Sequence, residues 1–327
     1  MMNIGIYVEG GHYLGLGNVY RMISLAKSLM KESYIQVYFI TTSDESICEL
    51  IQHHGFAHVI KEADLNGVSN ALQPLNLAVL IVDVLNIDIL FIKTIKARYP
   101  VQVVLFGNNN EANHVSDLVI NAIISTVQFR NENYIDRYHT HYLKGPKYLT
   151  LRDEFEFQGY HYSNAIKNIL LLFGGSDQAN LSFKILNDLL ADDRVKHLMF
   201  TVVTGAAYSN EASLERFSSM ENVRILKNIT NVNEVMLSSD FLFTSAGTSF
   251  FEGLYLGIPS VAFFQNDAQK DVFGNFFNTF DYEEVPSVVE LMLAVYGNYE
   301  CFCKGIADLE VGIGKKEIVE TILNLKK

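Results

Sequence analysis

Short apolar runs alternate with amphipathic segments along most of the chain. In the first part of the sequence, the expected strands cover residues 3–8, 35–40, 79–82 and 101–106, and the expected helices cover 19–30, 46–53 and 87–97. Strands that alternate with helices in this way are typical of βαβ units and of a parallel, doubly wound sheet. The pattern therefore predicts an α/β fold.

The alternation breaks between residues 142 and 168, where aromatic and charged residues mix. A second series follows, with expected strands at 168–173, 197–203, 223–226 and 241–244 and expected helices at 180–190 and 232–238. The two series predict two Rossmann-like domains, at 1–150 and 168–327, joined by a linker at 151–167. The last helix, at 315–327, has an apolar stripe of Ile318, Ile322 and Leu325 that could pack across the face between the domains.

Composition and charge narrow the class of protein. The 327 residues are 49% hydrophobic, which suffices for two domains of roughly 150 residues each. A net charge of -12 argues against a main role in binding nucleic acid or an anionic membrane. The three cysteines make neither a disulfide framework nor a four-ligand zinc site. Because no secretory signal and no apolar run of roughly 18 residues is seen, we expect a cytoplasmic protein without a membrane span.

The stretch from Phe243 to Gln269 has the order of a nucleotide-sugar site. A strand leads into small residues, Ser245 to Ser249, where backbone N–H groups at a helix N-terminus can approach a diphosphate. We place Glu252 in the first turn of that helix, where its carboxylate could accept ribose hydroxyls. Gly257 to Pro259 should end the helix, and a strand at 260–264 should bring polar residues to the sheet edge where ligands bind. The alternative is a βαβ unit with ordinary turn chemistry.

A glycine-rich turn also follows the first expected strand. It contains Gly15 and Gly17 but does not match GxGxxG, which argues against a dinucleotide site. Asn18 stands where a helix N-cap belongs, or its amide meets a sugar or a phosphate. Arg21 could pair with a nearby acid or help to hold an anion.

The second glycine turn joins the strand at 168–173 to the next helix. Gly174, Gly175 and Ser176 can offer backbone N–H groups to a phosphate, whereas Asp177 is expected to cap the helix. Asp83 ends an expected strand and could act as a base or cap the following helix.

The histidines and serines form no motif that indicates a metal site or a hydrolase triad. The histidines form no HExxH pair, and no GxSxG elbow occurs. His12 and His114 lie near expected strand-to-helix edges and are the remaining candidates for a base.

Several segments together resemble a known family. They are LGLGNVYRMISLAKSL, LIVDVLN, HVSDLVIN, GPKYLTLRDEF, LLFGGSDQANLS and EVMLSSDFLFTSAGTSFFEGLYLGIPSVAF. As a set, they resemble the UDP-sugar hydrolase of pseudaminic acid biosynthesis and the spore-coat polysaccharide proteins, which are similar to the N-acetylglucosaminyltransferase that makes lipid II. The resemblance implies a GT-B architecture, with two Rossmann-like domains facing a cleft and the nucleotide on the C-terminal domain.

The resemblance also implies roles for single residues. Residues of the two glycine turns would face the diphosphate, Glu252 would hold the ribose, and three polar residues would touch the sugar. The diphosphate set is Gly175, Ser176, Gly247, Thr248 and Ser249, and the sugar set is Asn266, Asp267 and Gln269.

The N-terminal half departs from the hydrolases it resembles. They have a catalytic histidine directly after the GxG turn, where this chain has Asn18, and an amide cannot take a proton at neutral pH. Their Asp-His-Tyr motif corresponds to Asp83-Val84-Leu85, and their paired acids correspond to the stretch at 107–110, Gly-Asn-Asn-Asn.

Three hypotheses follow from this mixture. A glycosyltransferase would pass the sugar to an acceptor hydroxyl, with Asp83, His12 or His114 as base, in surface-polysaccharide or nonulosonic-acid-type glycan biosynthesis. A hydrolase of the pseudaminic type would use water and a replacement for the missing histidine. A non-catalytic protein would only bind the nucleotide sugar. In each case we expect no metal cofactor, because helix N-termini and backbone amides can neutralise a leaving diphosphate.

Overall fold

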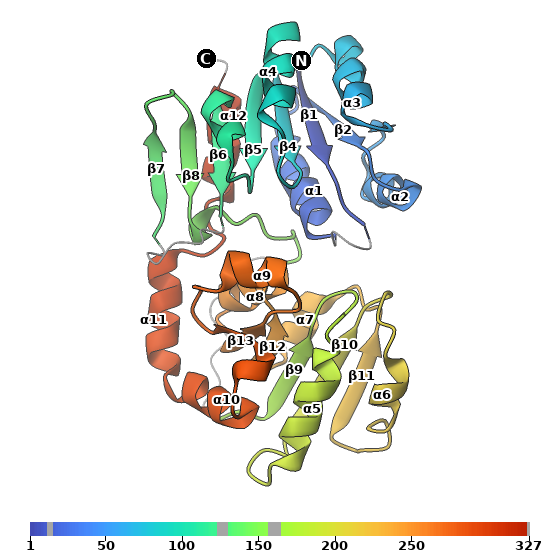
Figure 1. Cartoon of the computed structure of the whole chain (residues 1–327), viewed down its shortest axis with the longest axis vertical. Coiled ribbons are helices and arrows are strands. Elements are labelled where there is room, and N and C mark those ends of the chain that lie inside the picture. The colour runs from blue at the N-terminus through green and yellow to red at the C-terminus, as the bar shows by residue number, and fades with distance from the viewer. Residues whose placement is uncertain (12–15, 123–129, 156–164, 326–327) are drawn as a thin grey trace. The chain divides into compact units, whose positions relative to one another are not determined.

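A computed structural model describes residues 1–11, 16–122, 130–155 and 165–325 of the chain (Figure 1). Within the described residues the chain divides into two compact units. Of these residues, the first unit contains those in the ranges 1–122, 130–152 and 312–325, and the second unit contains those in the range 153–311. Each unit is an α/β sandwich around its own sheet.

The sheet of the first unit has eight strands in the order β3-β2-β1-β4-β5-β6-β8-β7. All neighbours are parallel except β7, which runs antiparallel to β8. The strands are β1 (Met2–Val8), β2 (Ile35–Thr41), β3 (Val59–Lys61), β4 (Val79–Asp83), β5 (Gln102–Phe106), β6 (Leu118–Asn121), β7 (Glu132–Ile135) and β8 (His141–Lys144).

Helices cover both faces of this sheet, as the alternation of apolar side chains along buried parallel strands requires. On one face, Ile4 and Ile6 share a core with α1 (Gly17–Leu29), α2 (Glu45–His53) and α12 (Lys315–Asn324). On the other face, Tyr7 and Leu80 pack with α3 (Leu65–Ala71) and α4 (Ile89–Arg98). Short 3-10 turns lie at η1 (Gln73–Leu75), η2 (Glu111–Val115) and η3 (Pro146–Tyr148).

The sheet of the second unit has six parallel strands in the order β11-β10-β9-β12-β13-β14. They are β9 (Asn168–Leu172), β10 (Met199–Thr204), β11 (Val223–Lys227), β12 (Phe241–Ser245), β13 (Ser260–Phe263) and β14 (Thr279–Phe280). The helices are α5 (Leu181–Ala191), α6 (Glu211–Glu215), α7 (Val232–Leu237), α8 (Thr248–Tyr255), α9 (Asp267–Phe273), η4 (Tyr282–Glu284), α10 (Val288–Gly297) and α11 (Tyr299–Leu309).

Helices α5 and α8 lie on opposite faces of this second sheet. Side chains of α5 and α10 share a core with Ile169 and Leu171 of β9 and with Phe241 and Phe243 of β12. Helix α8 packs closely on the other face, because a Cβ added at Gly253 would lie 2.6 Å from Leu242 Cδ2 and 2.8 Å from Ser260 Oγ. The loops after β9 and β12 therefore diverge to opposite sides of the sheet.

The predicted α/β class and the two parallel sheets are confirmed. The domain limits differ at the C-terminus, because α12 belongs to the first unit and not to a domain spanning 168–327. Ile318 and Ile322 are fully buried in the first core, and Leu325 packs against it. Arg152 ends one unit and Asp153 begins the other, inside the predicted linker, of which residues 156–164 lie outside the described part.

Among the helices that the structure describes, none has the length and apolar character needed to cross a bilayer.

Candidate functional sites at the sheet edges

Each sheet has one point where the strand order reverses, between β1 and β4 in the first unit and between β9 and β12 in the second. The loops that leave such neighbouring strands turn to opposite faces and open a crevice at the carboxyl ends of the strands, where ligands of open α/β folds bind. The predicted site residues can be judged against these two crevices.

In the second unit, the two predicted phosphate turns lie side by side. A Cβ added at Gly174, whose φ is +78°, would lie 3.9 Å from Ser245 Oγ. The turn also packs on the loop after β10, since a Cβ at Gly205 would lie 2.5 Å from Gly175 Cα. Added Cβ atoms at Gly175 and Gly247 would meet no atom within 4 Å. The structure thus brings the turn at 174–176 next to the start of α8, with open space beside both glycines.

The two helix N-termini at this crevice differ in their capping. The carboxylate of Asp177 accepts hydrogen bonds from the backbone N–H groups of Leu181 (2.8 Å) and Ser182 (2.9 Å), so α5 is capped by a buried acid. This confirms the predicted role of Asp177. Burial raises the pKa of Asp177, and hydrogen bonds from Ser182 and Leu181 oppose that shift.

Helix α8, by contrast, has no side-chain cap. Its N-cap is Gly247, and its first turn contains no acidic residue. Because the first N–H groups of a helix have no intrahelical partner and carry partial positive charge, this end suits an anion. Thr248 and Ser249 form the first two positions of that helix.

The predicted position of Glu252 is wrong. Glu252 is the fifth residue of α8, beyond the first turn, and its side chain is fully buried. Phe250 and Phe251 beside it are fully buried as well, so this part of the helix faces the protein interior. A contact of Glu252 with a ribose stays a prediction.

Gln265, for which the sequence suggested no separate role, connects three segments of the second crevice. Its Nε2 donates to the Phe173 carbonyl (2.6 Å), and its Oε1 accepts from the Ala179 N–H (3.2 Å). Its own N–H donates to Gln269 Oε1 (2.9 Å). The signal available in the sequence was an amide directly after a buried strand.

The residues predicted to touch a sugar lie at the start of α9, which follows β13. Asn266 caps α9, because its Oδ1 accepts from the Gln269 N–H (3.0 Å). Asp267 is exposed at the first position of α9. Asn266 and Gln269 thus hold the loop in shape, and their contact with a sugar stays a prediction.

In the first unit, Arg21 and Asp83 form a bidentate ion pair at the crevice. Arg21 Nε donates to Asp83 Oδ2 (2.9 Å), and Nη2 donates to Oδ1 (2.6 Å). Burial raises the pKa of Asp83, and the Arg21 guanidinium opposes that shift. The interpretation of Arg21 as the partner of an acid is confirmed. Asp83 does not cap α4, because Asp88 does so by accepting from the Leu90 N–H.

Asn18 extends this ion pair. Its Oδ1 accepts from Arg21 Nη2 at 3.0 Å. Arginine has only donors, so the amide atom that faces it must be the oxygen, and Nδ2 remains as a donor. The predicted N-cap role is wrong, because α1 begins at Gly17 and its N-cap is Leu16.

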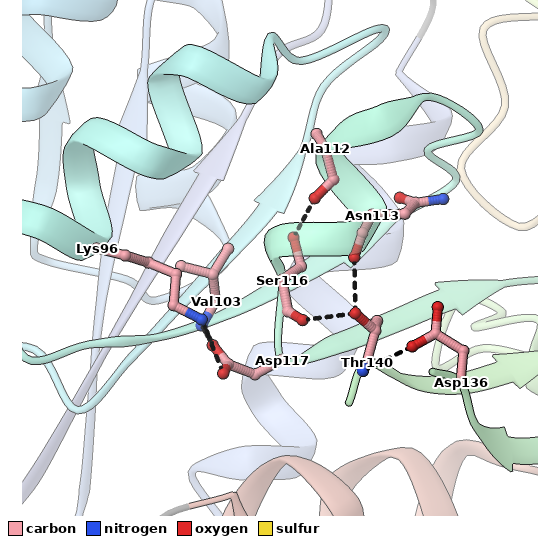
Figure 2. Close-up of polar contacts among 8 residues, drawn as sticks. All are labelled: Lys96, Val103, Ala112, Asn113, Ser116, Asp117, Asp136 and Thr140. Carbon is pink, nitrogen blue, oxygen red and sulfur yellow. Dashed lines mark hydrogen bonds and ion pairs between the residues drawn. The ribbon is translucent and has the colours of Figure 1, made fainter. Parts of the chain in front are cut away.

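The remaining candidate bases do not join this group. His114 lies in η2, where its exposed ring contacts that of Tyr138, with centroids 4.4 Å apart and the ring planes tilted by 30°. Figure 2 shows the polar contacts around that region, in which Thr140 Oγ1 donates to the Asn113 and Ser116 carbonyls. These segments precede β6 and β8 and so lie toward the amino-terminal edge of the sheet, away from Gly17 and Asp83. His12 lies outside the described residues.

The described parts of the chain contain no group of three or more His, Cys, Asp or Glu side chains placed to hold a metal ion.

Comparison with known proteins identifies proteins that are similar to the chain. No protein-family model matches the chain. An uncharacterized protein of Methanocaldococcus jannaschii is 35% identical over 333 residues, which cover 99% of this chain and 66% of the relative. The spore coat polysaccharide biosynthesis protein SpsG of Bacillus subtilis is 29% identical over 276 residues, covering 82% of this chain and 79% of SpsG. The chain is therefore similar to SpsG over most of its length.

A third relative is named for a reaction. The UDP-2,4-diacetamido-2,4,6-trideoxy-beta-L-altropyranose hydrolase of Campylobacter jejuni is 24% identical over 264 residues, covering 76% of this chain and 86% of that enzyme. The resemblance inferred from the sequence segments is therefore confirmed. The chain spans about two thirds of the length of its M. jannaschii relative, because 66% of that protein is matched.

Solved structures show the fold of this chain. MurG of Acinetobacter baumannii superposes with a TM-score of 0.66 at 12% identity, over 99% of both chains. UGT2 of Phytolacca americana, complexed with UDP-2fluoro-glucose and pterostilbene, gives a TM-score of 0.66 at 11% identity, over 100% of both chains. The chain has the α/β fold of the GT-B glycosyltransferases.

Proposed function

We propose that the protein is an enzyme that binds a nucleotide sugar, a UDP-sugar by analogy with its relatives, and transfers the sugar from its anomeric carbon to an acceptor hydroxyl. The uncapped N-terminus of α8 beside the glycine turn at 174–176 is the observation that carries the proposal. The pathway would be surface-polysaccharide or nonulosonic-acid-type glycan biosynthesis, to which the names of the Bacillus and Campylobacter relatives point.

The donor diphosphate would lie at the start of α8. Gly247 leaves open space there, so the backbone N–H groups of Thr248 and Ser249 can approach phosphate oxygens. The α5 terminus is a poorer site, because the Asp177 carboxylate already occupies its N–H groups. In this proposal the helix N-terminus neutralises the leaving diphosphate, and the reaction needs no metal ion.

The first crevice favours a transferase over a hydrolase that works through a histidine. Asn18 stands at the position of that histidine, and Arg21 holds its amide so that Nδ2 points away as a donor. A donor at this position can orient an acceptor molecule by one of its oxygens but cannot take a proton. Hydrolysis with a different base is the second candidate, which the Campylobacter relative supports.

The reaction can be tested by measuring nucleotide release from a panel of UDP- and CMP-sugars, first in buffer and then with a lysate glycan extract. We expect release that depends on the extract, with the sugar recovered on an acceptor. Release in buffer alone would instead identify a hydrolase. Binding of the donor without release under either condition would contradict both enzymatic functions and leave a sugar-nucleotide binding protein.

A further inference from the structure

Glu9 is a carboxylate at the first crevice that the sequence motifs do not single out. It directly follows β1 and is half-buried. Two hydroxyl groups donate to the same oxygen, Oε1: Tyr7 Oη at 2.6 Å and Thr42 Oγ1 at 2.6 Å. Distances of this size are typical of hydroxyl bonds to an ionised carboxylate.

The strand register places Glu9 at the point where the strand order reverses. Val8, the last residue of β1, pairs with Asp83, the last residue of β4. Glu9 is the next residue, so its backbone lies beside the end of β4, at a strand spacing of roughly 5 Å. The Glu9 side chain bonds to Tyr7, on the α3 and α4 face, whereas Asp83 bonds to Arg21 of α1 on the other face. The two acids therefore flank the crevice from its two sides.

The two acids differ in what their oxygens can still do. Both oxygens of Asp83 accept from Arg21. Glu9 makes both of its hydrogen bonds through Oε1, and within the described ranges no cation pairs with it. Among the residues that the structure describes, Glu9 thus offers Oε2 as a carboxylate oxygen that can accept a proton from a ligand.

The surroundings of Glu9 fix the direction of its carboxylate. Beyond the two hydroxyl contacts, the Gly10 N–H donates to Ser43 Oγ (3.0 Å), and the Ser43 N–H donates to Thr41 Oγ1 (3.1 Å). The loops after β1 and β2 are thus tied together around Glu9. A catalytic group needs this kind of support, since small misplacements of a reacting group reduce rates strongly.

We propose that Glu9 is the general base of the reaction, an inference that rests on the proposed function. The proton of the acceptor hydroxyl, or of water, moves to Glu9 Oε2 while its oxygen forms a bond to the anomeric carbon. The bond from that carbon to the diphosphate oxygen breaks, and its electron pair leaves with the nucleoside diphosphate. Glu9 then releases the proton to solvent.

The test compares kcat and KM of the full-length protein with those of Glu9→Gln, which keeps the size of the side chain and an oxygen for Tyr7 and Thr42. We expect kcat to fall by about 100-fold or more, the usual contribution of a general base, while KM for the donor changes little. Glu9→Asp should retain more activity than Glu9→Gln. The matched control is Glu32→Gln, an exposed acid in the turn before β2, which should leave kcat unchanged.

A chemical rescue experiment distinguishes loss of a proton acceptor from a purely structural effect of the substitution. Formate added to Glu9→Ala should restore part of the turnover if the missing group is a proton acceptor. A Glu9→Gln enzyme with a kcat within about threefold of the parent, well short of a base's contribution, would overturn the assignment. So would a kcat loss matched by an equal loss of thermal stability and without rescue by formate. If the parent protein itself releases no nucleotide, the proposed function fails instead, which separates the two outcomes.

Discussion

The crevices of the two units have the same strand order but opposite chemistry. In the second unit, glycines and the uncapped start of α8 offer backbone N–H groups. The nearby acid, Asp177, accepts hydrogen bonds from the start of α5. In the first unit, charged side chains dominate: the Arg21–Asp83 pair, with Asn18 attached, and Glu9. One topology can therefore present backbone N–H donors in one domain and charged side chains in the other. The residues that follow the strands decide which.

Loss of the Arg21–Asp83 pair should have the largest effect on the stability of the protein. Arg21→Met would leave the Asp83 carboxylate, 2% exposed, without its cation. Breaking a buried pair from one side costs about 3–5 kcal/mol, so we expect the free energy of unfolding in urea to fall by that order.

The control for this prediction is Lys96→Met, which removes a more exposed pair with Asp117 (Figure 2). That change should cost about 1 kcal/mol or less. If Arg21→Met is no more destabilising than Lys96→Met, the pair is not the structural centre of the first crevice.

Arg21→Met should also change how stability depends on pH. Burial raises the pKa of Asp83, and loss of Arg21 removes the contact that opposes the shift. The folded state then binds the proton more tightly than the unfolded chain does, so stability falls as pH rises above the ordinary carboxyl range. The destabilisation by Arg21→Met should therefore be smaller at about pH 5 than at about pH 8.

Gly247→Asp tests the crevice of the second unit, because it places a carboxylate at the start of α8. We expect the affinity for the nucleotide to fall by about 1.5–3 kcal/mol, the scale of a hydrogen bond to a charged group, in calorimetric titration. Stability should not fall, because Asp is among the best N-caps. Ser287→Asp adds the same charge at the N-cap of α10 and is the matched control. Equal affinity of both variants would argue against a diphosphate on α8.

Asn18→His returns a proton-accepting group to the position of the hydrolase histidine. We expect nucleotide release in buffer alone to rise by about tenfold or more, given the usual scale of general base catalysis. Asn18→Gln keeps the amide and should show no rise. A histidine variant that gains no hydrolysis would show that the first crevice does not present this position to the anomeric carbon.

Much of the fold could be predicted because its signals are local. Apolar runs identified the central strands, and the glycine turns marked where β1, β9 and β12 end. The prediction of Asp177 as a cap succeeded for the same reason, since the cap and the helix are adjacent in sequence. The short strands β6, β7 and β8 were missed, because each has only 4 residues and their pattern is weak.

The features that could not be predicted, or that were predicted wrongly, depend on contacts between distant residues or on the exact start of a helix. Arg21 and Asp83 are 62 residues apart, and the Glu9 contact with Thr42 spans 33, so no local pattern reports either pair. The stripe of α12 indicated burial but not which core would receive it. Small errors in helix starts misplaced Asn18 as a cap and Glu252 as a first-turn residue.

Asp177→Asn should have the smallest effect and addresses why the diphosphate would choose α8. The amide oxygen can still cap α5 and Asn tolerates the left-handed φ of 40°, so we expect a loss of about 1 kcal/mol or less in unfolding free energy. Nucleotide affinity should stay unchanged. The N–H groups of Leu181 and Ser182 donate to the side chain at position 177, so they are not directed at the ligand. A clear gain in affinity would mean that α5 shares the anion and that the two N-termini act together.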